Sequence, residues 1–366
     1  MPVRKISAPS TRCQMISDFM ARPLSIPAAR STVAGSAAQF ALTRGQMSDK
    51  AQFSDGFTPQ HDVAVVVACD ANYLPYAAVA ALQLAGRGEY DVLIGGPEPL
   101  SLPAFLQNAE IGHVAAVDRE ILDALPTDAR RSIATYMELF FARALHGIYR
   151  RILVLDSDVI FERGDPGRLL RADMLGHAVA AVRDNRQWRT PKRRVREFRQ
   201  LGRPAAPYFN AGVVMIDTDA WAQAGLTAKA ADFARNHLAG LGRDQALMNG
   251  MLYGDWAEIS PLWNWQFTWS SAQLMAVADP CIVHFIGPHK PWLDSADGIV
   301  PLRLRQDYAR ILPAHFPDAP RGARLGLRNL PDRRDLGKSM FKQWRAVGPM
   351  LDYLNRFPDE YTLLEP

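Results

Sequence analysis

Two aspartates one residue apart, Asp156 and Asp158, follow an apolar run near the middle of the sequence. Two carboxylates this close repel each other when they are poorly hydrated, and a divalent cation relieves the repulsion. Carboxylate oxygens suit Mg²⁺ or Mn²⁺, which keep coordination positions open for substrate phosphates. Because the same spacing also occurs in ordinary turns and helix caps, the pair alone leaves both interpretations open.

A second polar group ends a later apolar run and favours the metal site. His284 ends this run, and Gly287 and Lys290 follow closely. An imidazole beside carboxylates favours Mn²⁺ over Mg²⁺ modestly. A glycine lets the backbone approach a ligand, and a lysine neutralises a phosphate. A lone histidine at a strand end is more often a hydrogen-bonded core residue, but the combination predicts a site for a metal and a diphosphate.

Runs of apolar, often β-branched residues predict the strands that position these groups. Such runs are typical of strands buried on both faces of a parallel sheet. They lie at residues 63–68, 91–96, 113–117, 151–155, 208–217 and 282–287, separated by helical stretches at 75–85, 132–149 and 244–253. The alternation predicts an α/β fold with an open, mostly parallel sheet, helices on both faces and ligands beyond the carboxyl ends of the strands. Regular structure is expected to begin at Val63.

Other function classes lack their signatures in this sequence. There is no GxGxxG after the first strand and no GxxxxGK[ST], so neither a dinucleotide site nor a P-loop is predicted. The three cysteines, Cys13, Cys69 and Cys281, are far apart, which excludes a disulfide scaffold and suits a reducing cytosol. The longest charge-free stretch, 259–278, is too polar for a transmembrane helix.

The net charge of +4 is unevenly distributed along the 366 residues. Residues 1–46 carry six basic and one acidic side chain, residues 301–366 carry twelve and eight, and the middle is acidic. An acidic core without a recognition motif argues against nucleic-acid binding. Residues 1–60 are interpreted as a disordered extension, or as the product of a wrongly assigned start with Met47 as the true first residue.

The sequence resembles glycosyltransferase family 8. The resemblance covers residues 61–295 and rests on ordered blocks: Asp70–Tyr73, Leu155–Asp158, Phe209–Val213, Asp244–Asn249 and His284–Trp292. It implies a GT-A fold in a domain at residues 61–300. It also implies a metal-dependent, retaining transfer of a hexose, usually from a UDP-sugar, to a saccharide or lipopolysaccharide-type acceptor with α linkage.

The resemblance also implies roles for single residues. Uridine would be held by Asp70, Asn72 and Tyr73, with Tyr73 stacking on the base, and the diphosphate by Gly287 and Lys290. The ligands of Mn²⁺, or alternatively Mg²⁺, would be Asp156, Asp158 and His284. Asn210 would lie near the donor sugar, and Asp244 and Gln245 would line the reacting centre. Taken singly, Asn72 and Tyr73 are also compatible with an ordinary turn. Asn210 is compatible with a strand-end hydrogen bond, and Asp244 with a helix N-cap.

Gln245 is a poor nucleophile, so front-side attack by the acceptor is favoured over a double displacement through Asp244. One residue departs from the family pattern, because Glu138 occupies a position where an arginine is usual. Arg183, Arg186 and Arg189 are candidates to replace that arginine at the donor phosphate or to reach an anionic acceptor, although such a charge run is usually a solvated face. Asp184 is a weaker candidate for a sugar contact. A binding protein without transfer activity therefore remains an alternative. A nucleotidyltransferase is another, although the expected glycine-rich basic loop is missing.

Residues 301–366 form a basic, aromatic C-terminal extension. Cations interleave there with Met340, Phe341 and Trp344. Such a segment is typical of a helix on an anionic membrane surface, but also of a helix packed on the catalytic domain. The expected location is cytoplasmic, with peripheral contact at the cytoplasmic face of the inner membrane as one alternative.

Overall fold

The computed structural model describes residues 51–126, 133–268, 272–293, 300–320 and 333–366. They belong to one compact unit, Gln46–Pro366. Of the extension predicted at residues 1–60, the part up to residue 50, which includes the alternative start at Met47, lies outside the described residues. Regular structure begins earlier than predicted, because β1 (Gln52–Phe53) pairs antiparallel with β4 (Ile111–Ala115).

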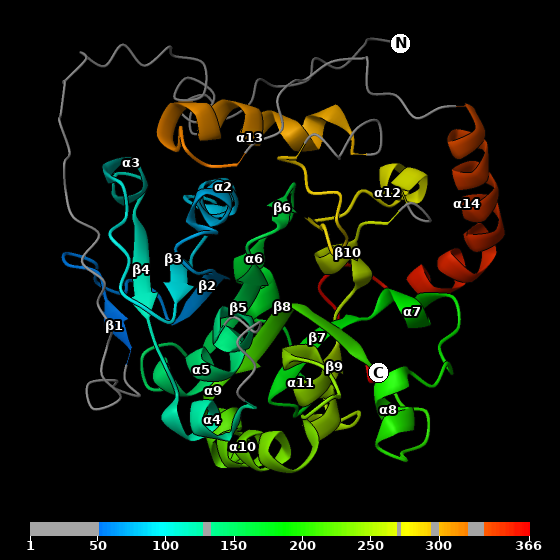
Figure 1. The fold of residues 1–366 in the computed structure, drawn as a ribbon, viewed down its shortest axis with the longest axis horizontal. Helices are drawn as coiled ribbons and strands as arrows, with labels where there is room; N and C mark the ends of the chain where they lie inside the picture. The colour runs from blue at the N-terminus through cyan, green and yellow to red at the C-terminus, as the bar shows by residue number, and fades with distance from the viewer. Residues whose placement is uncertain (1–50, 127–132, 269–271, 294–299, 321–332) are drawn as a thin grey trace, which may run out of the picture. The chain divides into compact units, whose positions relative to one another are not determined.

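A sheet of eight strands forms the centre of the molecule, in the order β1-β4-β3-β2-β5-β8-β7-β9 (Figure 1). The strands β2, β3, β4 and β5 run parallel to one another, whereas β8 is antiparallel to both of its neighbours. The bounds are β2 Val63–Ala68, β3 Asp91–Gly96, β5 Arg151–Asp156, β7 Val179–Arg183, β8 Phe209–Asp217 and β9 Ala257–Glu258. The mostly parallel sheet is confirmed, and the strand predicted at 113–117 begins two residues earlier.

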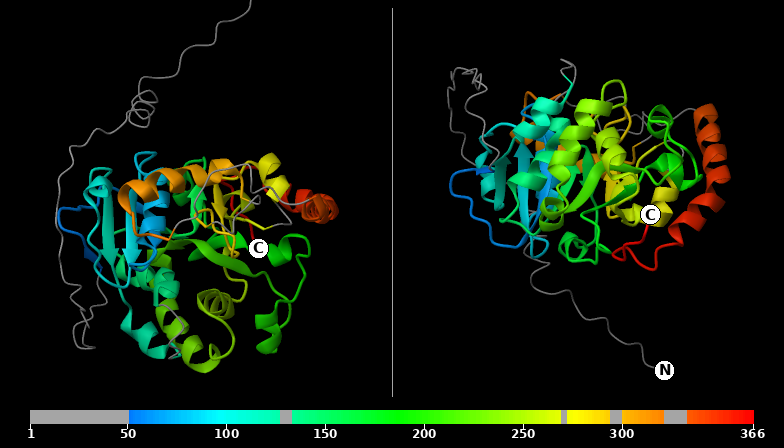
Figure 2. Two further views of the ribbon diagram at one scale, coloured as in Figure 1. Left: turned by 45° about the horizontal axis from the view of Figure 1, so that its top comes forward. Right: turned by 90° about the horizontal axis from the view of Figure 1, so that it is seen from below.

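Helices cover both faces of this sheet (Figure 2), which explains the unbroken apolar runs. Val65 of β2 packs into one core with α2, α6 and α13, while Val66 packs into the other with α4, α5, α10 and α11. These helices are α2 Leu74–Leu84, α4 Arg119–Ala124, α5 Met137–Ala144, α6 Pro166–Leu170, α10 Leu226–His237, α11 Asp244–Leu252 and α13 Leu302–His315. The remaining helices are α3 Ala104–Gln107, α7 Asn185–Trp188, α8 Arg196–Gln200, α9 Thr218–Gln223, α12 Ala272–Ala278 and α14 Arg333–Leu354.

The helix predicted at 132–149 is shorter than expected. Its described part is a 3₁₀-helix, Ile133–Tyr136, followed by α5, which ends at Ala144. Gly147 then adopts φ of 80°, a left-handed conformation that glycine tolerates and that turns the chain into β5. Residues 145–150 thus connect the end of the helix to the strand that carries Asp156.

A small second sheet, β10-β11-β6, supports the site from the side. It contains β6 (Val159–Phe161), β10 (Trp265–Gln266) and β11 (Ile282–His284). Asp156-Ser157-Asp158 turns the chain from the large sheet into β6, and His284 pairs opposite Val159. The aromatic residues Trp256, Trp263 and Trp265 are buried core residues, and Trp269 lies outside the described residues.

Arg183 does not act as a phosphate ligand, contrary to the prediction. Its guanidinium is buried and donates to the Glu258 carboxylate over 2.9 and 2.8 Å. Glu258, itself fully buried, also accepts from Tyr353 of α14 and from Arg356 over 2.9 Å. A buried guanidinium needs such a partner, so this cluster joins the C-terminal segment to β9.

Glu258→Ala is expected to lower the free energy of unfolding by about 3–5 kcal/mol, because Arg183 would remain buried without a countercharge. Urea unfolding measures the loss. The control, Glu89→Ala at an exposed position, should change stability by about 0.5 kcal/mol or less. Equal losses for the two variants would show that the buried cluster does not stabilise the fold.

Candidate active site

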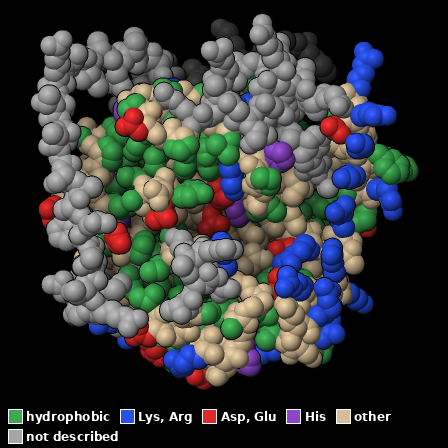
Figure 3. Space-filling model, viewed as in Figure 1, with side chains coloured by type: hydrophobic (Ala, Val, Ile, Leu, Met, Phe, Trp, Pro, Cys, Tyr) green, Lys and Arg blue, Asp and Glu red, His purple; other side chains and the backbone are tan. Residues whose placement is uncertain are grey.

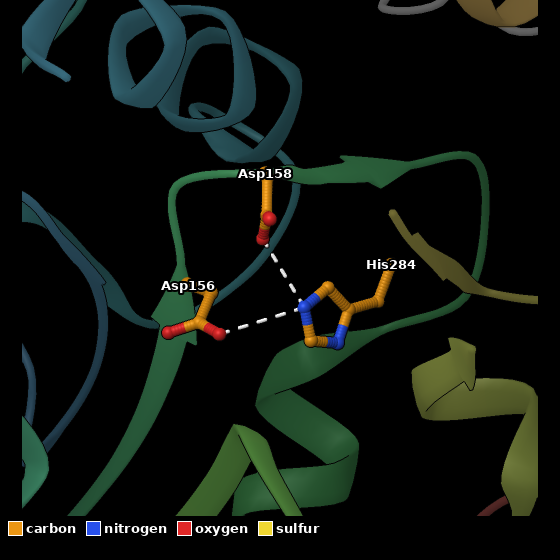
Figure 4. A group of neighbouring side chains, drawn as sticks. All are labelled: Asp156, Asp158 and His284. Atoms are coloured by element: carbon orange, nitrogen blue, oxygen red, sulfur yellow. Dashed lines mark ion pairs between the residues drawn. The ribbon is translucent and has the colours of Figure 1, made fainter. Parts of the chain in front are cut away.

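Asp156, Asp158 and His284 converge at the carboxyl end of β5 and point toward one another (Figure 4). His284 Nε2 lies 3.4 Å from Asp156 Oδ2 and 3.1 Å from Asp158 Oδ1. One ligand atom from each residue falls within 4.8 Å of the other two. Two carboxylate oxygens and an imidazole nitrogen at this spacing suit one divalent cation such as Mn²⁺. The predicted metal ligands are therefore brought together.

Backbone pairing fixes the position of each of the three residues. Ala68 of β2 pairs with Asp156 in parallel register, so the end of β2 lies next to the first aspartate. The Phe285 N–H donates to the Asp158 carbonyl over 3.0 Å, which holds the residue after His284 against the second aspartate. The triad thus depends on contact between the two sheets, because Asp156 ends β5 of the large sheet and His284 ends β11 of the small one.

A chain of amides fixes the tautomer of His284. The Gly212 N–H donates to Asn210 Oδ1 over 3.1 Å, so that atom must be the oxygen. Asn264 therefore directs its NH₂ to Asn210 over 2.8 Å and its oxygen to His284 Nδ1 over 3.0 Å. His284 must then donate from Nδ1, so Nε2 faces the aspartates and can hold either a proton or a metal ion. Metal-binding histidines are commonly oriented in this way.

The charges around the triad explain its protonation. Burial lowers the pKa of His284, but the charge of Asp158 and hydrogen bonds to both aspartates outweigh burial and raise this pKa to about 9. Burial opposes ionisation of Asp158, yet His284 and then Lys290 hold its pKa well below its ordinary value. Lys290 Nζ donates to Asp158 and to the Phe285 carbonyl. Protonated His284 thus supplies, next to the two carboxylates, the positive charge that a metal cation would otherwise supply.

Two residues that sequence reasoning did not assign complete this arrangement. A Cβ at position 212 would lie 2.0 Å from His284 Cε1 and 2.7 Å from Asp156 Oδ2, so Gly212 leaves the room that the triad needs. Asn264 orients His284 from a 3₁₀-helix, Pro261–Asn264. Gly212 was visible as part of the block Phe209–Val213, whereas Asn264 had no signal beyond its position in an apolar stretch.

The predicted reacting-centre residues extend the same network. Asn210 donates to Gln245 Oε1 over 3.1 Å, and the Gln245 NH₂ donates to Asp184 over 2.9 Å. Asp184 also accepts from Arg186 Nε over 2.8 Å. Gln245 is therefore held between β8 and the start of α7. Asp184, a weaker candidate in the sequence, is a buried support for Gln245.

Glu138 and Asp244 make this part of the site strongly acidic. Burial, and then the charge of Asp244, raise the pKa of Glu138 well above its ordinary value. Burial, and then the charge of Asp156, raise the pKa of Asp244 to about 7. Glu138 Oε1 is buried without a hydrogen-bond partner among the described residues. The residue that departs from the family pattern therefore faces the reacting centre and carries an electrostatic cost.

Glu138→Gln is expected to stabilise the metal-free protein increasingly as the pH rises. The pKa of this carboxyl is higher in the folded protein than in the unfolded chain, where it is about 4.3. Its contribution to the free energy of unfolding is therefore fully present below pH 4.3 and is lost as the pH rises toward the pKa of the folded protein. Each unit of upward shift corresponds to about 1.4 kcal/mol. Urea unfolding in EDTA at pH 5 and pH 8 measures the difference between variant and wild type. An equal difference at both pH values, as expected for the exposed control Glu89→Gln, would contradict this electrostatic cost.

The residues predicted to hold uridine follow β2 at the same edge of the sheet. Asp70 Oδ1 accepts from the N–H groups of Asn72 and Tyr73 over 3.0 and 3.1 Å and so shapes the loop. The Tyr73 ring is 44% exposed and begins an aromatic series in which Tyr76 stacks on Trp292 at 4.0 Å. This series joins the loop after β2 to the segment that contains Gly287 and Lys290.

Comparisons with known proteins agree with this arrangement. The family model described as glycosyl transferase family 8 matches residues 64–296. General stress protein A of Bacillus subtilis is 30% identical over 159 residues, covering 39% of this chain and 53% of that protein. The lipopolysaccharide 1,3-galactosyltransferase of Salmonella typhimurium is 28% identical over 196 residues, covering 49% and 55%. The chain spans about half the length of the curated relatives it matches.

Solved structures show the same fold. A crystal structure of the galactosyltransferase LgtC with donor and acceptor sugar analogues superposes with a TM-score of 0.55 at 21% identity, covering 68% of this chain and 96% of that chain. A structure of an active-site mutant of LgtC gives a TM-score of 0.52 at 18% identity, with the same coverage. The predicted GT-A type of α/β fold is confirmed.

Proposed function

The chain belongs to glycosyltransferase family 8, and we propose that it is a retaining hexosyltransferase that uses a UDP-sugar, a divalent metal ion and a saccharide acceptor. The observation that carries the proposal is the convergence of Asp156, Asp158 and His284 beside the loop that follows β2. Carboxylates and a histidine at this edge of an open sheet suit a metal and a diphosphate.

The residues of the triad fit Mn²⁺, with Mg²⁺ as the second choice. His284 directs its Nε2 at the carboxylates, and Gly212 keeps the space between them open. A bound ion supplies positive charge that offsets the charge of the leaving diphosphate. Lys290, next to Asp158, adds a second positive charge for the same phosphates. Gly287 would allow their close approach, since a Cβ there would meet no atom within 4 Å.

The donor would lie across the ends of β2 and β5. Tyr73 offers an exposed ring on which uracil can stack, while Asp70 and Asn72 would hold uridine. The donor sugar would then lie next to Asn210, near Gln245 and Asp244. This assignment places the anomeric carbon between the diphosphate and α11.

Front-side attack agrees best with these side chains. Gln245 is a neutral amide whose orientation is fixed by Asp184 and Asn210, so it positions the sugar rather than attacks it. The acceptor oxygen forms the new bond on the face from which the diphosphate leaves, and its proton passes to a departing phosphate oxygen. Asp244, the chemically better nucleophile, is partly protonated near neutral pH because its pKa is raised to about 7.

The stereochemistry of the product tests the proposed reaction class. Proton NMR of the sugar first released from a UDP-α-hexose should show the α anomer, before mutarotation mixes the two forms. Immediate appearance of the β anomer would contradict retention. A covalent hexosyl adduct on Asp244, detected by mass spectrometry, would replace front-side attack by double displacement.

The acceptor is proposed to be a saccharide of lipopolysaccharide type. Two of the matched relatives are named for transfer to lipopolysaccharide, at positions 1,3 and 1,2, the second from Escherichia coli with 29% identity over 188 residues, covering 48% of this chain and 54% of that protein. An acceptor of this kind is joined to lipid, so the enzyme would work at the cytoplasmic membrane face.

Helix α14 supports this membrane location. Its inner face packs through Gln343, Ala346 and Met350, which explains the predicted C-terminal helix packing. Its outer face exposes Met340 and Trp344, the latter by 72%. Figure 3 shows Lys and Arg side chains gathered over α14 at the right edge of the molecule. Such a face suits an anionic bilayer surface. No helix among the residues that the structure describes is long and apolar enough to cross a membrane.

Met340→Ala combined with Trp344→Ala should weaken binding to vesicles of phosphatidylglycerol and phosphatidylcholine about tenfold, because apolar area leaves the interface. Co-sedimentation measures this, and binding should also fall with salt. The control Ile148→Ala removes exposed apolar area elsewhere. Equal binding of both variants would contradict a membrane role for α14. Truncation is avoided because it removes Tyr353 and Arg356 from Glu258.

A further inference from the structure

A second concave site lies between α14 and the segment that begins at α7. It is a cavity of about 590 Å³. Five basic side chains line it, three from the segment after β7 and two from α14: Arg186, Arg189, Arg193, Lys342 and Arg345. Figure 3 shows Lys and Arg side chains gathered over α7, α8 and α14 on the right of the molecule. The site is separate from the metal triad, which lies at the end of β5.

The charges of this cavity are only partly balanced. Arg186 pairs with Asp184 and Glu197. Among the described residues, no acidic side chain forms an ion pair with Arg189, Arg193, Lys342 or Arg345. The described residues that line the cavity include no aspartate or glutamate. Several unneutralised cations around one concave space attract an anion, and guanidinium groups bind phosphates and carboxylates with two parallel hydrogen bonds.

The remaining wall suits a sugar. Phe341 contributes an exposed aromatic ring, and Asn185 and Thr190 contribute groups that can hydrogen-bond to hydroxyls. Aromatic rings pack on the apolar faces of pyranose rings, whereas a bare inorganic anion would gain nothing from them. The wall therefore combines the chemistry of a charged group with that of a saccharide.

Arg186 connects this cavity to the reacting centre. Its side chain lines the cavity and donates to Asp184, which accepts from Gln245. Only one carboxylate thus separates the cationic cavity from the amide assigned to the donor sugar. Lys290, which is assigned to the diphosphate, pairs instead with Asp158 of the triad and does not line this cavity.

We propose that this cavity binds an acidic sugar of the acceptor, through a phosphate or carboxylate held by Arg189, Arg193, Lys342 and Arg345. The inference rests on the proposed function and deepens it by naming the acceptor as an anionic saccharide. It also assigns Arg189 and Arg193 of the basic segment to acceptor recognition instead of donor binding. The α14 residues that line the cavity do not include Met340 and Trp344, the two residues assigned to the membrane surface.

Calorimetric titration of the full-length protein with Mn²⁺ and saturating UDP tests the proposal. UDP occupies the donor phosphate site, so a second anion reports on the cavity. The probes are mannose 6-phosphate, galacturonate, mannose and inorganic phosphate. At least one acidic sugar should bind about tenfold or more tightly than mannose and than inorganic phosphate, and salt should weaken this binding.

Two matched variants locate the binding. Lys342→Gln with Arg345→Gln should lower affinity for the acidic sugar about tenfold or more, since two charge-assisted contacts are lost. Arg333→Gln with Arg334→Gln removes two charges from the same helix outside the cavity and should leave that affinity unchanged.

Equal affinities in the two variants would overturn the proposal, as would wild-type protein that binds neither acidic sugar. Equal binding of inorganic phosphate and mannose 6-phosphate would overturn the saccharide part. Binding of anionic vesicles without binding of either sugar would assign these cations to the membrane instead. Failure of UDP itself to bind would count against the proposed function, which separates the two failures.

Discussion

Asp156→Ala and Asp158→Ala are each expected to lower the rate of UDP release about a thousandfold or more. Each removes one of two carboxylates that hold the ion next to the leaving diphosphate, and several kcal/mol of charge stabilisation are lost with it. Initial rates of UDP formation from a UDP-hexose measure the effect, and Mn²⁺ affinity by electron paramagnetic resonance should fall in parallel. The control Asp123→Ala removes an exposed carboxylate from α4 and should change neither quantity.

Asp156→Ala separates loss of the site from loss of the fold. Asp156 is half exposed and its charge raises the pKa values of Asp244 and Glu138. Its removal should therefore leave the metal-free protein at least as stable as wild type at pH 8, while activity disappears. Full turnover in either aspartate variant would show that the metal assignment is wrong.

Gly212→Ala is expected to abolish metal binding and activity as completely as loss of Asp156. The new methyl group would lie 2.0 Å from His284 Cε1, 2.6 Å from its Nδ1 and 2.7 Å from Asp156 Oδ2. The buried strand β8 cannot move away, so His284 must leave the carboxylates and lose its bond to Asn264. Mn²⁺ titration and UDP release measure both effects.

Gly337→Ala is the matched control for this substitution. It adds the same methyl group within α14, where no atom lies within 4 Å, and alanine favours a helix over glycine. Its activity and metal affinity should equal those of wild type. Retention of Mn²⁺ affinity in Gly212→Ala would show that the ion is not held at the triad.

The sequence was sufficient to predict the strands that carry the site. The apolar runs at β2 and β5 match the predicted bounds within one residue, because the central residues of each strand are apolar and buried. Parallel strand ends meet at one edge, so Asp70 and Asp156 could be placed together from spacing alone. His284 was linked to this site from its position at the end of another apolar run, followed by Gly287 and Lys290, and the family resemblance then implied its role as a metal ligand.

The parts that could not be predicted depend on contacts distant in sequence. Nothing local to Arg183 distinguishes it from its exposed basic neighbours, since its partner Glu258 lies on another strand. Glu138 was recognised as a departure, but its burial near Asp244 depends on the packing of both α5 and α11 against β8. The antiparallel direction of β8 also has no local signature, because a strand buried on both faces has the same apolar sequence pattern whether it runs parallel or antiparallel to its neighbours.

Metal-dependent release of UDP by the purified protein tests the central claim most directly. The protein is incubated with Mn²⁺, with Mg²⁺ or with EDTA, and with each of a panel of UDP-hexoses without acceptor. We expect slow release of UDP from at least one of them with Mn²⁺, less with Mg²⁺ and none with EDTA. Folded protein that binds Mn²⁺ and UDP-hexose but releases no UDP, with or without saccharide acceptors, would contradict a transferase and leave a nucleotide-sugar-binding protein.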